Sequence, residues 1–522
     1  MTRDAVDLLI VGGGINGAGI ARDATGRGLK VLVCEQNDLA SATSQWSSKL
    51  IHGGLRYLEM YEFRLVREAL AEREVLLSLA PHIIRPLRFV LPHNKRLRPA
   101  WMIRLGLFLY DHIGGKRTLK GTESVDLARD PRGAKLKPSM TRAFEYSDAW
   151  VEDSRLVVLN AKDAAERGAE ILTRTRATAA RREDGHWRVT LTDMDTGETR
   201  DVRARILVNA AGPWVDRFLK QGLGRNDDDH LRLVKGSHVI VPRLYEGEHA
   251  YILQNHDRRV IFTIPYERDY TLIGTTDIPY EDDPARVHCT PEEIDYLCDA
   301  VNEYFEPQIG PEDVVRTYSG VRPLYDDKRA NPSAVTRDYV FDVESPEGGA
   351  ALLSIYGGKI TTYRKLAEHA LEKLAPFLGD LRPAWTAEAP LPGGDLPNRD
   401  FSGFVGTLTA DYPFLTDRMA ERYARYYGTR APRFLDGTTS IGDLGEDFGG
   451  DLYAREVDYL VDQEWARTAD DVLWRRTKLG IRIDADGRER LAAYLSEKLG
   501  ERARPLAADP FPTPKQIKVA YG

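Results

Sequence analysis

The sequence predicts an α/β protein that has a dinucleotide-binding unit, an antiparallel sheet inserted into it and a helical region at its C-terminal end. Three observations carry this prediction. A glycine-rich turn separates an apolar strand from a small-residue helix within residues 7–30. Short β-rich runs alternate with polar turns between residues 236 and 276. Beyond a segment rich in proline and glycine, residues 401–522 have a mostly helical pattern.

The dinucleotide-binding unit begins with the apolar run Leu8–Val11, after which Gly12, Gly14 and Gly17 fall at the G-x-G-x-x-G spacing. Gly12 permits a tight turn, Gly14 lets the backbone approach a pyrophosphate, and Gly17 lets helix and strand pack closely. The helix that follows would point its N–H groups and positive dipole end at that pyrophosphate. The context of strand, turn and helix carries the prediction, because the spacing alone is also found in turns between core elements.

A second apolar run, Val31–Cys34, ends at Glu35, about where a ribose 2′-hydroxyl would lie. An acid here, rather than arginine, favours an unphosphorylated ribose and therefore FAD or NAD over NADP. The hydroxyl- and glycine-rich stretch 38–54 is typical of a loop that wraps a polar ligand. Residues 204–212 resemble the strand of a dinucleotide-binding fold that returns to the cofactor after an insertion.

Composition excludes several classes of protein. The 522 residues are enough for two or three domains with substantial cores. The chain has 73 basic and 80 acidic residues, so we expect no whole-chain attraction to nucleic acid. Its cysteines, Cys34, Cys289 and Cys298, are too few for a disulfide framework and lack metal-ligand spacing, so we expect free thiols and no metal site. Without a signal-like start or a run of about 18 apolar residues, a cytoplasmic protein is expected.

Residues 85–117 reverse the charge balance locally, since they hold eight Lys or Arg and a single acid, Asp111. Within them, residues 101–110 are mainly apolar, carry an aromatic residue at each end and are too short to span a bilayer. This pattern is typical of an interfacial membrane helix flanked by basic charge. The alternative is a buried helix with solvated ends.

A second strand–glycine–helix unit lies near residue 357. The strand 350–356 is followed by Gly357, Gly358 and Lys359, and then by a helix that reaches about residue 375. A lysine at the positive end of a helix makes this turn a natural anion site.

Several long segments resemble the FAD-dependent, respiratory (aerobic) glycerol-3-phosphate dehydrogenase family. They cover essentially the whole chain, including its C-terminal helical part. The segments are Ser47–Glu59, Leu97–Asp111, Tyr318–Leu324, Thr336–Tyr339, Gly357–Lys365 and Asp470–Gly480. The chain departs from the family at Gln45 and Trp46, where relatives usually carry small residues, so the packing of this loop is a question for the structure.

The resemblance implies an FAD-binding domain of the glutathione-reductase/D-amino-acid-oxidase type and a noncovalent FAD. It further implies oxidation of sn-glycerol 3-phosphate to dihydroxyacetone phosphate by hydride transfer to the flavin, with electrons passed to membrane quinone. Such a protein is peripheral on the cytoplasmic face of the inner membrane, which adds weight to residues 85–117 as a membrane contact. An oxidase that uses O₂ and a non-catalytic, flavin-bearing membrane-surface protein are the alternatives, and a homodimer stays open.

With this resemblance we expect a discontinuous FAD-binding domain made of residues 1–80, 150–215 and 314–375. The other expected regions are a basic, amphipathic insertion (81–149), a substrate domain (216–313), a linker (376–400) and a C-terminal helical domain (401–522).

The substrate's phosphate is a dianion, so its pocket needs cations, preferably guanidinium groups. The matched motifs imply substrate contacts from Arg56, Tyr57, Arg322, Arg337 and Lys359. Arg322 and Lys359 are also expected to be catalytic, since a positive charge near the flavin would stabilise its reduced anion. His238 matches a family histidine and is the candidate base, with an arginine or lysine of the pocket as its competitor.

The resemblance also implies a set of FAD contacts that extends beyond the glycine-rich turn. These residues are Gly12, Gly14, Gly17, Glu35, Ser44, Ser47, Lys49, Gly212, Gly357 and Thr361.

Overall fold

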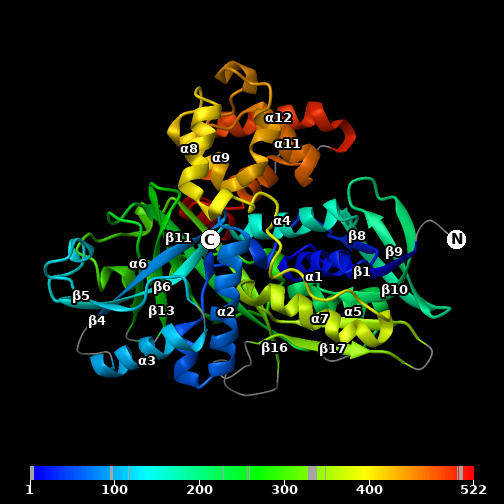
Figure 1. Ribbon diagram of the computed structural model, residues 1–522, viewed down its shortest axis with the longest axis horizontal. Coiled ribbons are helices and arrows are strands. Elements are labelled where there is room, and N and C mark those ends of the chain that lie inside the picture. Colours follow the sequence, from blue (N-terminus) through cyan, green and yellow to red (C-terminus); the bar gives the residue numbers. More distant parts are fainter. Residues whose placement is uncertain are drawn as a thin grey trace.

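The computed structural model describes residues 5–93, 98–115, 117–226, 229–255, 257, 259–326, 338–346, 349–502, 504 and 510–521. Two sheets form the body of the molecule, and most of the C-terminal helices sit together at one end of it (Figure 1).

The first sheet contains the predicted dinucleotide-binding unit. Its central strands run parallel in the order β18 (Ala351–Tyr356), β10 (Thr199–Asn209), β1 (Ala5–Val11), β2 (Val31–Cys34) and β7 (Glu170–Leu172). Antiparallel strands extend it at β17 (Val340–Glu344), β8 (Thr175–Glu183) and β9 (His186–Asp193). The predicted return strand is thus the end of β10, which lies beside β1.

Strand β1 is buried on both faces, as a parallel strand between two layers should be. Leu8 and Ile10 pack with the helices α1 (Ile15–Gly26), α4 (Asp153–Glu166) and α7 (Tyr363–Leu378). Leu9 and Val11 point to the opposite face, where they join the core under β8–β10 and α5 (Val215–Leu223). This double burial fixes the position of the glycine-rich turn at the end of β1.

The second sheet is mainly antiparallel and larger than the sequence suggests. Its order is β15 (Ile278–Pro279), β11 (Leu231–Pro242), β14 (Tyr270–Gly274), β13 (Val260–Tyr266), β12 (Ala250–Gln254), β4 (Ile84–His93), β6 (Arg142–Val151) and β3 (Leu50–Ile51). Strand β16 (Arg316–Tyr325) pairs with β11, and β5 (Glu123–Asp126) pairs with β6. Helix α6 (Pro291–Asn302) packs on one face of this sheet.

The expected region boundaries differ from these strand pairings. Strands β4 and β5 and most of β6 lie within 81–149, expected as a separate insertion, yet they belong to the same sheet as 231–279. Strand β16, expected in the FAD-binding domain, also belongs to this sheet. In β4 the apolar Leu87, Phe89 and Leu91 alternate with residues such as Arg88, which pairs with Glu145. Arg85 and Arg88 of the basic region are therefore part of a strand of the second sheet, where composition alone suggested a separate region.

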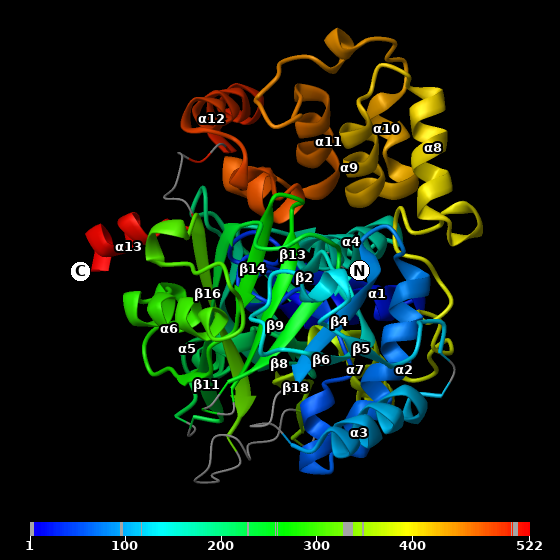
Figure 2. The ribbon, with the colours of Figure 1, turned by 90° about the vertical axis from the view of Figure 1, so that its left-hand side faces the viewer.

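Helix α3 (Ala100–Ile113) is apolar but not buried, contrary to the alternative of a buried helix. Only Leu107 and Tyr110 of this helix are buried. Trp101, Leu105 and Phe108 are 65%, 51% and 56% exposed. The helix packs against the start of α2 (Phe63–Leu79), at the end of the molecule opposite the C-terminal helices (Figure 2). Among the described residues, no helix is long and apolar enough to cross a bilayer.

The C-terminal helices form a layer over one end of the two sheets (Figure 2). They are α8 (Phe401–Asp411), α9 (Asp417–Tyr427), α10 (Pro432–Leu435), α11 (Ala454–Glu464), a π-helical turn Asp471–Arg476 and α12 (Ala485–Leu499). The final helix, α13 (Pro514–Tyr521), leaves this layer and lies against α6, where Ile517 is buried. The expected C-terminal helical domain thus includes a tail that returns to the second sheet.

Candidate active site

Two neighbouring cavities, of about 720 Å³ and about 650 Å³, lie where the two sheets meet. The smaller one runs along the glycine-rich turn, and the larger one continues toward α3. Residues that line both form the junction between them: Gly14, Thr43, Ser44, Trp46, Ala210, Gly212 and Val321. Their shared wall makes the pair one long site, which suits a ligand with two chemically different ends.

The glycine-rich turn has the geometry that the sequence predicts. Gly12 has a φ of +112°, and a Cβ there would lie 2.4 Å from the carbonyl oxygen of Ala210. A Cβ on Gly17 would lie 2.0 Å from the carbonyl oxygen of Gly12, so Gly17 serves close packing and lines neither cavity. Gly14 caps α1 and lines both cavities, which places the helix N-terminus at their junction.

Glu35 ends β2 and lines the smaller cavity. One carboxylate oxygen accepts a hydrogen bond from the Gly13 N–H (2.8 Å) and the other from the Asn37 N–H (2.8 Å). Burial raises the pKa of this carboxyl group, while the two N–H donors oppose that shift. The glycine cradle and an acid at this position fit the adenosine half of FAD.

The loop between β2 and β3 supplies the next predicted contacts. Ser44 lines both cavities and accepts a hydrogen bond from the Ile15 N–H (3.0 Å). Ser47 lines the larger cavity, and its hydroxyl donates to Asp153 (2.8 Å). Lys49 differs from the prediction: its side chain lines neither cavity, because its ammonium is buried against Asp153 at 2.8 Å. Lys49 therefore stabilises the loop from the side that faces away from the cavities.

Of the remaining predicted FAD residues, Gly357 and Thr361 line the larger cavity, and Gly212 lies at the junction of the two. Gly357 has a φ of +76°, and its carbonyl accepts a hydrogen bond from the Asn16 side chain (3.2 Å). Thr361 Oγ1 accepts from the His52 N–H (3.3 Å). Gly212 has a φ of +56° at the end of β10. The turn after β18 is thus tied directly to the start of α1, although more than 300 residues separate them.

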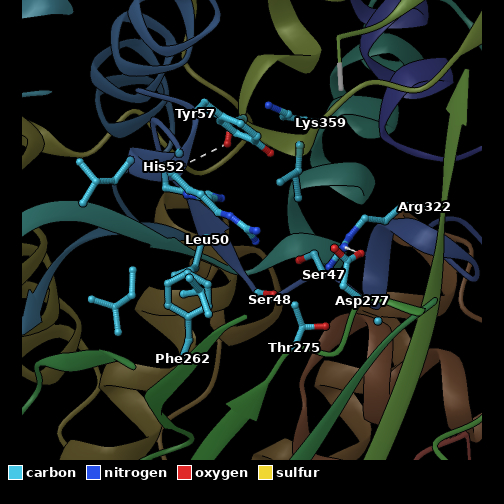
Figure 3. A pocket seen from close by; sticks show the side chains of 18 of the residues that line it. Ser47, Ser48, Leu50, His52, Tyr57, Phe262, Thr275, Asp277, Arg322 and Lys359 are labelled. Carbon is cyan, nitrogen blue, oxygen red and sulfur yellow. Dashed lines mark hydrogen bonds and ion pairs between the residues drawn. The ribbon is translucent and has the colours of Figure 1, made fainter. Parts of the chain in front are cut away.

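The larger cavity brings together cationic side chains from three separate elements. Arg56 and Tyr57 come from the 3₁₀ turn Leu55–Met60, Arg322 from β16, and Lys359 from the turn before α7. The Lys359 ammonium lies 3.9 Å from the centre of the Tyr57 ring. Arg322 Nη1 lies 3.1 Å from an oxygen of Asp277, and Figure 3 shows both pairs along the cavity wall. Arg337 lies outside the described residues.

Among the described residues, two histidines line this cavity, and both have a lowered pKa that favours the neutral form. His238 on β11 stacks on Tyr318 (4.6 Å between ring centres), and its Nε2 lies 2.9 Å from Ser48 Oγ. Burial, with repulsion from Lys49 and Arg322, lowers the pKa of His238 well below its usual value. Burial, with repulsion from Lys359 and Arg322, lowers the pKa of His52 to about 4.

Sequence reasoning missed His52 and Asp277 as candidates. His52 lies inside Ser47–Glu59, a segment that resembles the family, and four residues before Arg56. This position could have marked it as a candidate site residue. Asp277 gave no such signal, because it meets Arg322 only through the pairing of β11 with β16 and β15.

Toward α3 the larger cavity becomes apolar. Leu58, Leu91, Ile103, Leu109 and Phe262 line this part, so the cavity reaches from the cationic cluster to the exposed apolar helix.

All three cysteines are buried and free. Within the described part of the chain, no three His, Cys, Asp or Glu side chains are grouped as a metal site would require.

Known proteins match nearly the whole chain. A family model described as "FAD dependent oxidoreductase" matches residues 7–364, and one described as "C-terminal domain of alpha-glycerophosphate oxidase" matches residues 384–504. D-erythritol 1-phosphate dehydrogenase of Brucella abortus is 56% identical over 475 residues, which are 91% of this chain and 94% of the relative. Aerobic glycerol-3-phosphate dehydrogenase of Escherichia coli is 54% identical over 496 residues (95% and 98%).

A solved structure is similar across the full length as well. The glycerol-3-phosphate dehydrogenase from Bacillus halodurans, in complex with FAD, has a TM-score of 0.75 and 28% identity, and the match covers 96% of this chain and 92% of that one. The family model, the relatives and the solved structure all indicate an FAD-dependent protein, as do the glycine-rich turn and the loop that follows it. The chain therefore belongs to the FAD-dependent oxidoreductases, in the group that carries the alpha-glycerophosphate oxidase type of C-terminal domain, and its cofactor is FAD.

Proposed function

We propose that this protein oxidises sn-glycerol 3-phosphate to dihydroxyacetone phosphate and passes the electrons to a membrane quinone. The observation that carries this proposal is the position of Arg56, Arg322 and Lys359 in one cavity that continues into the FAD cradle. A phosphate dianion needs such a group of cations, and an alcohol to be oxidised must lie beside the flavin.

Residues of both cavities would hold FAD. Glu35 and the N-terminus of α1 suit the adenosine and pyrophosphate, and the turn at Gly357 together with Thr361 suits the flavin end. When bound, FAD supplies the hydride acceptor. Arg56 and Arg322 bind and orient the phosphorylated substrate, and Asp277 keeps the Arg322 guanidinium in place. Lys359 adds positive charge on the side where negative charge develops, with Tyr57 packed against its ammonium.

The substrate hydroxyl must also lose its proton. We retain His238 as the acceptor, because a neutral imidazole on the cavity wall can take a proton. A specific observation favours a second candidate, His52: it lines the same cavity, and its pKa of about 4 keeps it neutral as well. Because a depressed pKa makes either histidine a weak base, the cations of the cavity must also assist loss of the proton by stabilising the developing alkoxide.

The identity of the polyol phosphate is tested by direct competition. The Brucella abortus relative is named for D-erythritol 1-phosphate and the Escherichia coli relative for glycerol 3-phosphate. With a soluble quinone analogue as acceptor, steady-state kcat/KM should be at least tenfold higher for sn-glycerol 3-phosphate than for D-erythritol 1-phosphate. A preference for D-erythritol 1-phosphate would change the proposed substrate but not the proposed reaction, oxidation of an alcohol by FAD. Release of hydrogen peroxide at the rate of turnover in air would instead identify an oxidase.

Access to quinone would come from α3. Its exposed apolar side chains lie beside Tyr61 and Phe63, which are 81% and 42% exposed, and Arg98 and Arg104 are exposed on the same segment. Isolated apolar side chains are normal on a surface, but a contiguous group with aromatic and basic neighbours is typical of an interfacial helix. The apolar arm of the larger cavity opens toward this helix. We infer a peripheral protein whose α3 lies on the cytoplasmic membrane surface.

Flotation with vesicles that contain an anionic phospholipid tests this surface. Trp101→Ser, Leu105→Ser and Phe108→Ser combined should release the protein, and Arg98→Gln with Arg104→Gln should weaken binding in a salt-dependent way. Arg96 belongs to the same basic group but lies outside the described residues. Met194→Ser with Ile441→Ser is the matched control, since these exposed apolar residues lie far from α3 in the sequence. Unchanged flotation of the triple variant would exclude α3 as the anchor.

A further inference from the structure

The Asp471–Lys478 segment of the C-terminal layer lies directly behind the loop that carries the FAD contacts. We call residues 38–49 the FAD loop. Two of its residues, Ala40 and Lys49, have φ values of 62° and 58°, in the left-handed region that residues other than glycine rarely adopt. Such a backbone persists only when surrounding contacts hold it.

The first contact is a buried ion-pair network at the start of the FAD loop. The Asp38 carboxylate, which is fully buried, accepts hydrogen bonds from Arg475 Nε (2.5 Å) and from Arg476 Nη1 (2.8 Å) and Nη2 (2.9 Å). Asp471, from the same segment, pairs with Arg174 (2.7 Å). The Arg174 N–H in turn donates to the Asn37 carbonyl (2.8 Å), so the network reaches the residues next to Glu35.

The second contact is at the end of the FAD loop. Lys478 Nζ donates to Ser154 Oγ (3.1 Å) and lies 3.5 Å from Asp153 Oδ1. The same Asp153 carboxylate binds Lys49 Nζ and Ser47 Oγ, each at 2.8 Å, and the side chains of this ion pair are fully buried. A single carboxylate thus joins the C-terminal layer to two residues of the loop.

The third contact is aromatic and uses the residue that departs from the family pattern. Trp46 lines both cavities and lies 5.0 Å, between ring centres, from Phe511 of the C-terminal tail. Phe511 is fully buried and stacks on Trp474 of the Asp471–Lys478 segment at 4.2 Å. The carbonyl of Pro512 accepts a hydrogen bond from the Thr317 N–H (2.9 Å), which fixes the tail on β16.

We propose that the C-terminal layer is part of the FAD site: Asp471–Lys478 and Phe511 hold the FAD loop in its cofactor-binding conformation, and Lys478 is a positioning residue for the cofactor. Two ionic contacts, at the start and the end of the loop, and one aromatic contact at Trp46 come from one short segment and the tail. Each buried ion pair is sensitive to the loss of one partner, because the other charge is then left unpaired in a dry environment. The proposal depends on FAD binding and not on the substrate.

The test uses the full-length holoenzyme and measures how fast FAD leaves it, from the rise of flavin fluorescence after dilution. Lys478→Gln should speed FAD dissociation at least about tenfold, and Lys478→Arg, which keeps the charge, should restore part of the retention. Arg422→Gln is the matched control. It breaks another buried pair, with Glu456 (2.6 Å), inside the C-terminal helices, and neither residue lines either of the two cavities.

A second readout separates positioning from general loss of stability. Added FAD raises the melting temperature of a folded FAD-binding protein by an increment that grows with the logarithm of the FAD concentration over the dissociation constant. This increment should shrink in Lys478→Gln and remain near the parental value in Arg422→Gln. If Lys478→Gln does not fold, Phe511→Ala takes its place with the same expectation. FAD dissociation within about twofold of the parent in the folded variant, or equal acceleration in Arg422→Gln, would overturn the proposal.

Discussion

The two cavities of the site are built in different ways. Four of the predicted cofactor contacts that line the smaller, adenosine-side cavity, Gly12, Gly14, Glu35 and Ser44, come from one short stretch of the chain, and the Glu35 carboxylate there accepts a backbone N–H; later segments complete the cavity walls. The larger cavity takes the cations of its proposed substrate site from the 3₁₀ turn at Arg56, from β16 and from the turn before α7. Local spacing therefore describes the cofactor-binding stretch of the first cavity, while the cation cluster of the second comes together only through long-range packing.

This difference separates cofactor retention from chemistry, so variants in the two cavities should fail in different ways. Changes in the larger cavity should lower kcat/KM while FAD stays bound. Changes in the smaller cavity should release FAD while the FAD-loaded fraction keeps its rate.

The largest effect is expected from Arg322→Gln in the larger cavity. Loss of a charge-assisted contact to the substrate should lower kcat/KM for sn-glycerol 3-phosphate by about 10³-fold, with FAD content unchanged. Arg316→Gln is the control, since Arg316 lies on the same strand but lines neither cavity. Steady-state kinetics and the flavin-to-protein absorbance ratio check both halves of this expectation. A fall of less than tenfold would remove Arg322 from the substrate site.

His238→Ala should lower kcat by about 10²-fold and change KM far less, as expected for loss of a proton acceptor. His52→Ala, measured beside it, identifies the alternative base. An unchanged kcat in His238→Ala together with a large loss in His52→Ala would move the role to His52.

In the glycine-rich turn that borders the smaller cavity, Gly17→Ala should weaken FAD binding about 30-fold. Its Cβ would lie 2.0 Å from the Gly12 carbonyl oxygen and must displace the turn. Gly406→Ala in α8 is the control, because a Cβ there meets nothing within 4 Å. FAD titration of the protein after flavin removal measures the affinity. Normal affinity in Gly17→Ala would show that the turn tolerates displacement.

Glu35→Gln should have a smaller effect, an increase of about tenfold in the FAD dissociation constant with kcat of the loaded enzyme unchanged. The amide keeps the side chain's shape but has only one oxygen to accept the bonds from the Gly13 and Asn37 N–H groups. A loss of kcat at saturating FAD would contradict the division between the two cavities.

The last expected effect is on stability and not on activity: a pH dependence that belongs to the larger cavity. The pKa of His52 is about 4 in the folded protein, below its ordinary value of 6.5, so the folded state binds fewer protons than the unfolded state between these values. Stability should fall as pH drops from about 6.5 to about 4, by at most about 1.4 kcal/mol per pH unit from this group. Melting temperatures of His52→Asn should fall less steeply, whereas those of His112→Asn, an exposed histidine on α3, should follow the parent.

The same contrast explains what could be predicted from the sequence. The turn at Gly12, helix α1 and Glu35 follow from local spacing and were placed correctly. Strands β4 and β6 were not placed in the second sheet, because they join it through the pairing of β4 with β12, which lies more than 150 residues further along the chain, and composition pointed to a separate basic region. Lys49 was assigned to FAD by motif, but its charge is used by Asp153 behind the loop. Asp277 and the link from Lys478 to the FAD loop depend on long-range packing that no local pattern shows.

The most direct measurement of the central claim, that the cation cluster presents a polyol phosphate to FAD, is anaerobic reduction of the purified yellow protein. Addition of sn-glycerol 3-phosphate should bleach the visible band of the oxidised flavin and form one dihydroxyacetone phosphate per FAD. Arg322→Gln should retain its flavin but bleach far more slowly. A flavin that stays oxidised in the parent protein with both sn-glycerol 3-phosphate and D-erythritol 1-phosphate would contradict the account.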